Sequence, residues 1–247
     1  MAATGVSASS SAPVHGGTLV VAIDAQPTGF DPITADNPTP GAASVFNEIF
    51  ASLTAPTASG IYGPYLAESL AHNKNDTRWV IRLRPGAEFA DGTPIDANAV
   101  VFNLDRVKTS GLAFSQVQSF EASGSLTVVA TMTRPWSAFP AALSGQSGAI
   151  ASPTAINSEG KNFATKPVGS GPYELQSWSQ GNQIVLVRNP HFFRSGMPYL
   201  DKVIYKIITD PSSRLAALQA GNVDVAEVDP GQAVAGGINT SSQYSFG

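Results

Sequence analysis

The chain has no cysteine and few charged residues. The absence of cysteine from its 247 residues excludes disulfide bonds, thiolate nucleophiles and cysteine-ligated metals. Charged residues make up 13% of the sequence, against ~25% in typical globular proteins. The net charge is -4, so nothing indicates a basic surface for nucleic acid, and we expect no nucleic-acid partner. No apolar run approaches the ~20 residues of a membrane-spanning helix.

The start of the chain lacks the features of a secretion signal. Residues 1–15 are rich in alanine, serine and threonine, without a basic start, an apolar core or apolar periodicity. We interpret them as a flexible leader, or as a start that follows a removed signal. A cytosolic protein with an irregular N-terminus is the alternative.

Motifs for metal, cofactor or nucleophilic chemistry are missing. His15, His72 and His191 lie far apart, and none has a histidine or carboxylate at helical metal-binding spacing. Gly169-x-Gly171 resembles the start of a dinucleotide fingerprint, but Glu174 stands at the third glycine and a strand-like segment follows. Pyrophosphate binding needs a helix N-terminus there. We therefore expect no metal, no cofactor and no catalytic residues.

The pattern of apolar residues predicts a mixed α/β fold. Hydrophobic residues make up 43% of the chain, which is enough for a real core. The loop 24–32 contains two prolines and a glycine at the end of a predicted strand, a common ligand position in α/β folds. Strands are predicted at 18–23, 78–84, 125–133, 173–178, 183–188, 202–208 and 223–228. Helices are predicted at 41–55, from 97 to about 108 with Asp96 as N-cap, at 137–143 before a loop at 144–148, and after Ser212 or Ser213 with Gly221 as the terminal residue.

A tight turn is predicted at residues 169–172. Gly169 and Gly171 flank a serine, and glycine permits unusual backbone angles and the close approach of another backbone. Pro172 has a fixed φ and no N–H to donate. An alternating, strand-like segment follows. We therefore interpret Gly169, Gly171 and Pro172 as a structural turn that delivers the chain into a sheet.

Several motifs, in order, resemble those of the family 5 extracellular solute-binding proteins of bacterial ABC importers, the dipeptide, oligopeptide and nickel receptor group. The resemblance covers nearly all residues from Gly16 onward. The departures are mild: Ser170 replaces a threonine, and Phe192-Phe193 replaces the usual Tyr-Trp. The matching segments are residues 17–22, 30–32, 64–69, 79–94, 96–106, 167–173, 188–190, 200–203 and 214–224.

The resemblance implies a periplasmic-binding-protein-like fold of class II, cluster C type, with a mixed sheet flanked by helices. It implies that the chain is essentially lobe one with its extra small subdomain, and that the C-terminal second lobe is missing from it. The expected divisions are a leader at 1–15, a discontinuous main subdomain at 16–40 and 167–247, and a smaller inserted subdomain at 41–166.

The resemblance also implies a function. Such a protein is an extracytoplasmic receptor, periplasmic or lipid-anchored at the cell surface, that closes two lobes on a peptide or similar small solute and delivers it to an ABC permease. Candidate ligand contacts lie in three loops. They are Gln26, Thr28, Gly29 and Phe30 after the first strand, Phe114, and Gln146, Ser147 and Gly148.

Two other classes of function stay open at this point. One is a hydrolase of peptides or glycans, which would need two converging carboxyl groups in a cleft. The other is a receptor-like module for signalling or adhesion. For each candidate ligand residue, the alternative to ligand contact is a role in loop structure or core packing.

Overall fold

The computed structural model describes residues 13–228. The predicted leader falls largely outside these residues, as does the end of the segment 167–247. Among residues 13–228, no helix is both long and apolar enough to cross a bilayer. The elements are β1 (Thr18–Ile23), α1 (Pro40–Ile49), β2 (Thr54–Pro56), β3 (Tyr62–Pro64), β4 (Ala67–His72), β5 (Arg78–Leu83), α2 (Ala97–Ser110), β6 (Val117–Ala122), β7 (Thr127–Met132), α3 (Phe139–Ala142), the 3-10 helix η1 (Gly145–Gly148), α4 (Pro153–Glu159), the 3-10 helix η2 (Gly160–Ala164), β8 (Tyr173–Ser179), β9 (Gln183–Arg188), β10 (Lys202–Ile207), α5 (Pro211–Gln219) and β11 (Val225–Ala226).

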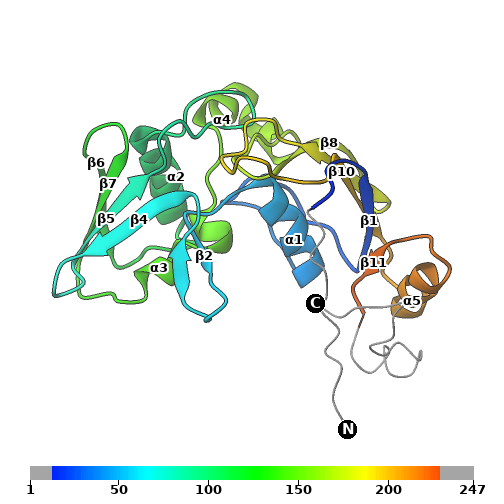
Figure 1. Ribbon diagram of the computed structural model, residues 1–247. Coiled ribbons are helices and arrows are strands. Elements are labelled where there is room, and N and C mark those ends of the chain that lie inside the picture. The colour runs from blue at the N-terminus through cyan, green and yellow to red at the C-terminus, as the bar shows by residue number, and fades with distance from the viewer. Residues whose placement is uncertain (1–12, 229–247) are drawn as a thin grey trace, which may run out of the picture.

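A five-stranded mixed sheet carries both ends of the described chain. Its strand order is β11-β1-β10-β9-β8. Strand β1 pairs in parallel with β10 on one side and with β11 on the other, whereas β8, β9 and β10 are antiparallel. Figure 1 shows this sheet on one side of the molecule, with α1 beside it and α5 next to β11. The three parallel strands therefore end at the same edge.

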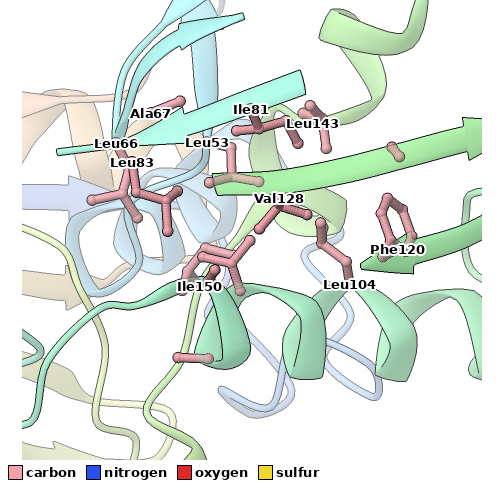
Figure 2. Close-up of a cluster of buried hydrophobic side chains, with 14 of the residues drawn as sticks. Leu53, Leu66, Ala67, Ile81, Leu83, Leu104, Phe120, Val128, Leu143 and Ile150 are labelled. Carbon is pink, nitrogen blue, oxygen red and sulfur yellow. The ribbon is translucent and has the colours of Figure 1, made fainter. Parts of the chain in front are cut away.

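A four-stranded antiparallel sheet forms the other side of the molecule, in the order β4-β5-β7-β6. Helix α2 covers it, and Asp96 caps the helix as predicted, accepting a hydrogen bond from the Ala99 N–H at 2.8 Å. Figure 2 shows side chains from these strands and from α2 pointing toward one another, among them Ile81, Val128 and Leu104. All three are fully buried. This cluster is the core of the smaller subdomain.

A second hydrophobic cluster lies under the five-stranded sheet. It joins Ile184 and Leu186 of β9 to Phe46 and Ile49 of α1. The first cluster runs instead from Ala51 to Ile150. The expected limits of the inserted subdomain, 41–166, would separate α1 from the sheet that it contacts. The division stays a prediction, and the packing favours the narrower limits 51–150.

The turn at residues 169–172 lies where three chain segments cross between the two cores. Gly171 donates its N–H to the Ile49 carbonyl at 2.9 Å, and Ala151 forms a β-bridge with Gly169. The buried Ser170 hydroxyl donates to the Ile150 carbonyl at 2.7 Å and accepts from the Ala51 N–H at 3.2 Å. One serine side chain thus ties together both connections to the smaller subdomain.

The two glycines of this turn are needed because the backbone of α1 passes very close to them, and not because of their backbone angles. Neither Gly169 nor Gly171 has a positive φ, so the expectation of special backbone angles is wrong. A Cβ on Gly169 would lie 1.9 Å from the Ile49 carbonyl oxygen, and one on Gly171 would lie 2.4 Å from the Glu48 carbonyl oxygen. No side chain fits in either place.

Several predicted elements differ in detail, and the strand predicted at 223–228 covers only Val225–Ala226. The helix predicted at 41–55 ends at Ile49, where the chain turns extended at Phe50. The loop predicted at 144–148 contains a turn of 3-10 helix. Helix α5 is capped by Asp210, which accepts from the Ser213 N–H, instead of by Ser212 or Ser213. Pro211 at the first helical position fits this earlier start.

An ion pair joins the loop after β1 to α2. The Arg106 guanidinium contacts both Asp31 oxygens, at 2.9 and 3.1 Å, and both side chains are mostly buried. We expect Arg106→Ala to lower the free energy of unfolding by about 1–3 kcal/mol, because the buried Asp31 charge loses its partner. Urea denaturation measures this. The exposed Arg82 is a matched control, with an expected change within ~0.5 kcal/mol; equal losses in the two variants would contradict the assignment.

Candidate functional site

The carboxyl ends of the parallel strands carry two acidic side chains. Asp24 follows β1, and Glu227 follows β11, the neighbour of β1 in the sheet. In open α/β sheets, ligands bind outside this edge of the strands. The N-terminus of α1 lies at the same place, because a Cβ on Gly41 would be 2.6 Å from Glu227 Oε2. The topology therefore brings together residues about 200 positions apart.

The two carboxyl groups are unequally satisfied. Asp24 accepts a 2.7 Å hydrogen bond from the hydroxyl of Thr39, which also caps α1. Oε2 of Glu227 is buried and has no hydrogen-bond partner among residues 13–228, although the carboxyl group of Glu227 as a whole interacts with the backbone and side chain of Asp24. Burial raises the pKa of Glu227, and the nearby charge of Asp24 raises it further. Two adjacent carboxyl groups, one of them with a raised pKa, suit a hydrogen-bond donor or a cationic group.

The loop after β1 is held against the β8–β9 hairpin. Oε1 of Gln26 accepts hydrogen bonds from the Trp178 indole N–H at 3.1 Å and from the Gly181 N–H at 2.9 Å. Thr28 Oγ1 accepts from the Asp36 N–H at 2.9 Å. Gly29 lies against Ala164. These three predicted ligand residues all have structural contacts that fix the loop at the sheet edge.

Gln146 brings the third predicted loop to the first. Its amide donates to the carbonyls of Pro32 and Ala35, at 3.0 and 2.7 Å. Its oxygen accepts from Asn37 Nδ2 at 2.9 Å. Oδ1 of Asn37 is buried, and no described residue forms a hydrogen bond with it. These hydrogen bonds join the loop that contains Gln146 to the loop after β1.

The other two residues of the third loop contact their own segment. Ser147 donates to the Ala142 carbonyl at 2.9 Å. A Cβ on Gly148 would lie 1.8 Å from the Leu143 carbonyl oxygen, so that position needs glycine for close packing. Both residues therefore shape the loop that presents Gln146.

The two predicted aromatic contacts do not face solvent. Phe30 is fully buried and packs edge-on against Trp178 in the second cluster. Phe114 is 2% exposed and contacts Phe120 and Phe139 in the first cluster. Neither ring presents surface to a solute in this structure, because each fills a core. Phe114 also lies apart from the other predicted residues.

Sequence reasoning missed three polar residues of this edge, namely Asp24, Asn37 and Glu227. Asp24 directly follows the strand predicted at 18–23, so the strand-end rule was an available signal there, whereas Glu227 lies inside the strand predicted at 223–228 and follows only the shorter observed strand Val225–Ala226. Asn37 carries no such signal. Its orphaned oxygen results from the contact with Gln146, 109 positions away.

A cavity of about 750 Å³ lies between α4 and the edge strand β8. Trp178, whose indole N–H donates to Gln26 in the loop after β1, also lines this cavity. None of the predicted ligand residues lines it. Lys166 and Glu159 in its wall lie 3.7 Å apart. Among residues 13–228, no group of three or more histidine, aspartate or glutamate side chains is placed to hold a metal ion.

The fold defines a class of protein: a mixed α/β lobe with a five-stranded mixed sheet and a separate four-stranded antiparallel sheet. The sequence profile of the bacterial extracellular solute-binding proteins, family 5 Middle, matches residues 62–243. The chain belongs to this family. The resemblance seen in the sequence is thereby confirmed.

Known relatives agree with this assignment. The glutathione-binding protein GsiB of Shigella flexneri is 34% identical over 168 residues, which cover 65% of this chain and 33% of that protein. The oligopeptide-binding protein AppA of Bacillus subtilis, solved with a nonapeptide, superposes with a TM-score of 0.82 at 27% identity, over 91% of this chain and 46% of that one. MoaA of Agrobacterium tumefaciens R10, solved with mannopinic acid, gives 0.77 at 29%, over 86% and 45%. The chain spans about a third of the length of the curated relatives and less than half of the solved ones.

Proposed function

We propose that the chain is part of an extracytoplasmic solute receptor that serves an ABC importer. In this proposal a peptide or similar small solute binds at the carboxyl ends of β1, β10 and β11, and a second lobe closes over it before delivery to a membrane permease. Family membership supports the proposal. The observation that carries it in the structure is the pair of carboxyl groups of Asp24 and Glu227 at the edge where α/β folds bind ligands, with Oε2 of Glu227 unpartnered among residues 13–228.

The chemistry of this edge favours a solute with a donor or positive group. Asp24 and Glu227 supply negative charge, and Asn37 supplies a second unpartnered acceptor oxygen. Relatives named for glutathione or peptide binding have solutes with such groups. Closure of two lobes would add contacts that exist only in the closed form, which is how ligand binding selects that form.

The proposal is tested on the full-length gene product. Mass spectrometry of the small molecules that co-purify with it would first identify the solute. We then expect Glu227→Gln to weaken binding of that solute about tenfold or more, with a similar melting temperature. Glu121→Gln, at an exposed glutamate of β6, is the matched control and should not change the dissociation constant.

A second variant tests whether the connection between the two loops contributes to solute binding. Gln146→Ala removes the side chain that joins the two loops, so we expect both weaker binding and a lower melting temperature. Unchanged affinity in both variants would remove this edge as the solute site. Turnover of a peptide or oligosaccharide panel by the wild-type protein would favour a hydrolase instead.

A further inference from the structure

A small pocket lies at the opposite end of α1 from the proposed solute site. Its volume is about 320 Å³. Helix α1 begins beside Glu227 and ends beside this pocket, which is lined by Glu48 from its last turn. Tyr199 also lines the pocket, and its carbonyl accepts a hydrogen bond from the Gly16 N–H, just before β1 begins. The pocket is therefore at the starts of the parallel strands, whereas the proposed solute site is at their ends.

Glu48 supplies an acid with no internal counter-charge. No lysine, arginine or histidine among residues 13–228 forms an ion pair with it. Burial raises its pKa to about 7. It also stands in the C-terminal turn of α1, where the helix dipole disfavours a negative charge and favours a cation. A positively charged ligand group would relieve both effects.

Aromatic rings form the walls around this acid. Tyr65, Tyr173 and Phe192 line the pocket together with Tyr199. Burial raises the pKa of Tyr65 and of Tyr173, and the negative charge of Glu48 raises both further, so both rings lie near the carboxyl group. Tyr199 is 38% exposed, which leaves the pocket accessible from solvent. Aromatic faces attract ammonium groups.

Arg194 provides a positive charge in the same pocket. Its guanidinium lies 4.5 Å from the centre of the Tyr65 ring and 5.7 Å from that of Phe193. Burial raises the pKa of Tyr65; the charge of Arg194 partly opposes this increase, and the charge of Glu48 adds to it. Tyr65 thus lies between two opposite charges that do not pair with each other.

We propose that this pocket is a second ligand site, which binds a free amino acid in its zwitterionic form. The ammonium group would bind Glu48, the carboxylate would bind Arg194, and the side chain would pack against the tyrosine and phenylalanine rings. The volume is at the lower end of the ~300–1,000 Å³ typical of small-molecule sites and suits a ligand of this size. This site is separate from the solute edge and does not depend on the proposed function.

The test uses ligand-observed NMR with three amino acids, alanine, leucine and phenylalanine, at millimolar concentration. Two analogues of phenylalanine lack one charged group each: 2-phenylethylamine has no carboxylate, and 3-phenylpropionate has no ammonium group. We expect at least one amino acid to bind. If phenylalanine does, each analogue should bind about tenfold more weakly.

Variants assign the signal to this pocket. Glu48→Gln and Arg194→Gln should each weaken amino-acid binding about tenfold. Glu121→Gln and Arg78→Gln, at exposed strand positions, are matched controls and should bind as the wild type does. Glu227→Gln should also leave this binding unchanged, which separates it from binding at the solute edge. Lack of binding by all three amino acids would overturn the proposal, as would equal binding by the Glu48 and Arg194 variants and their controls.

Discussion

Gly169→Ala is expected to lower the free energy of unfolding by about 3 kcal/mol or more. The new methyl group would lie 1.9 Å from the carbonyl oxygen of Ile49 and 2.9 Å from the Phe50 ring. A backbone oxygen at the end of α1 cannot move aside as a flexible side chain can. The β-bridge to Ala151 would be lost with it. Urea denaturation followed by circular dichroism measures the change.

Gly171→Val extends the same test to solute binding. Its Cβ would lie 2.4 Å from the Glu48 carbonyl oxygen, so we expect a large loss of stability. Gly29→Ala is the control, because the added methyl group would make ordinary contact with Ala164 at 3.4 Å, and its expected effect is within ~0.5 kcal/mol. Loss of solute binding by Gly171→Val at an unchanged melting temperature would show that the turn acts at the ligand instead.

The second large effect is a dependence of stability on pH that comes from Glu48. Its pKa is about 7 in the folded protein, against 4.5 for an unperturbed glutamate, and the cause is burial. Because the folded pKa is the higher one, the folded state holds the proton more tightly. Its stabilising contribution is complete below 4.5 and is lost as the pH rises through about 7. The loss amounts to about 3 kcal/mol.

Glu48→Gln isolates this contribution. The wild type should lose about 3 kcal/mol more than the variant between about pH 5 and pH 8, as measured by urea denaturation at each pH. The groups that face Glu48 are Tyr65, Tyr173 and Tyr205, and their pKa values are raised above 10, outside this range. Parallel pH profiles of the two proteins would contradict the assignment.

Local signals in the sequence predicted much of the fold. The Asp96 cap of α2 and the alternating residues of β8, β9 and β10 lie where they were expected, since their signals act over a few neighbouring residues. Strands β4 and β6 were missed. Ala67–His72 is half-exposed and carries a bulge, and Val117–Ala122 carries another, so neither has a regular alternation.

The candidate site was less predictable than the fold. The sequence located two loops that Gln146 joins, but it offered Phe30 and Phe114 as ligand contacts although both rings fill hydrophobic cores. An exposed aromatic residue and a buried one look alike in a sequence, because burial depends on what packs against the ring. Trp178 covers Phe30 from 148 positions away.

The sequence by itself determined the family, the mixed α/β class and most of the helices and strands, because ordered motifs and local periodicity are written in consecutive residues. The tertiary structure alone decided which polar atoms lack a partner. Glu227 meets Asp24 only because β11 pairs with β1. Glu48 shares a pocket with Tyr65, Tyr173 and Arg194 only because α1 ends beside the starts of the strands. Charge, burial and hydrogen bonding act through space, so these sites exist only once distant segments are packed together.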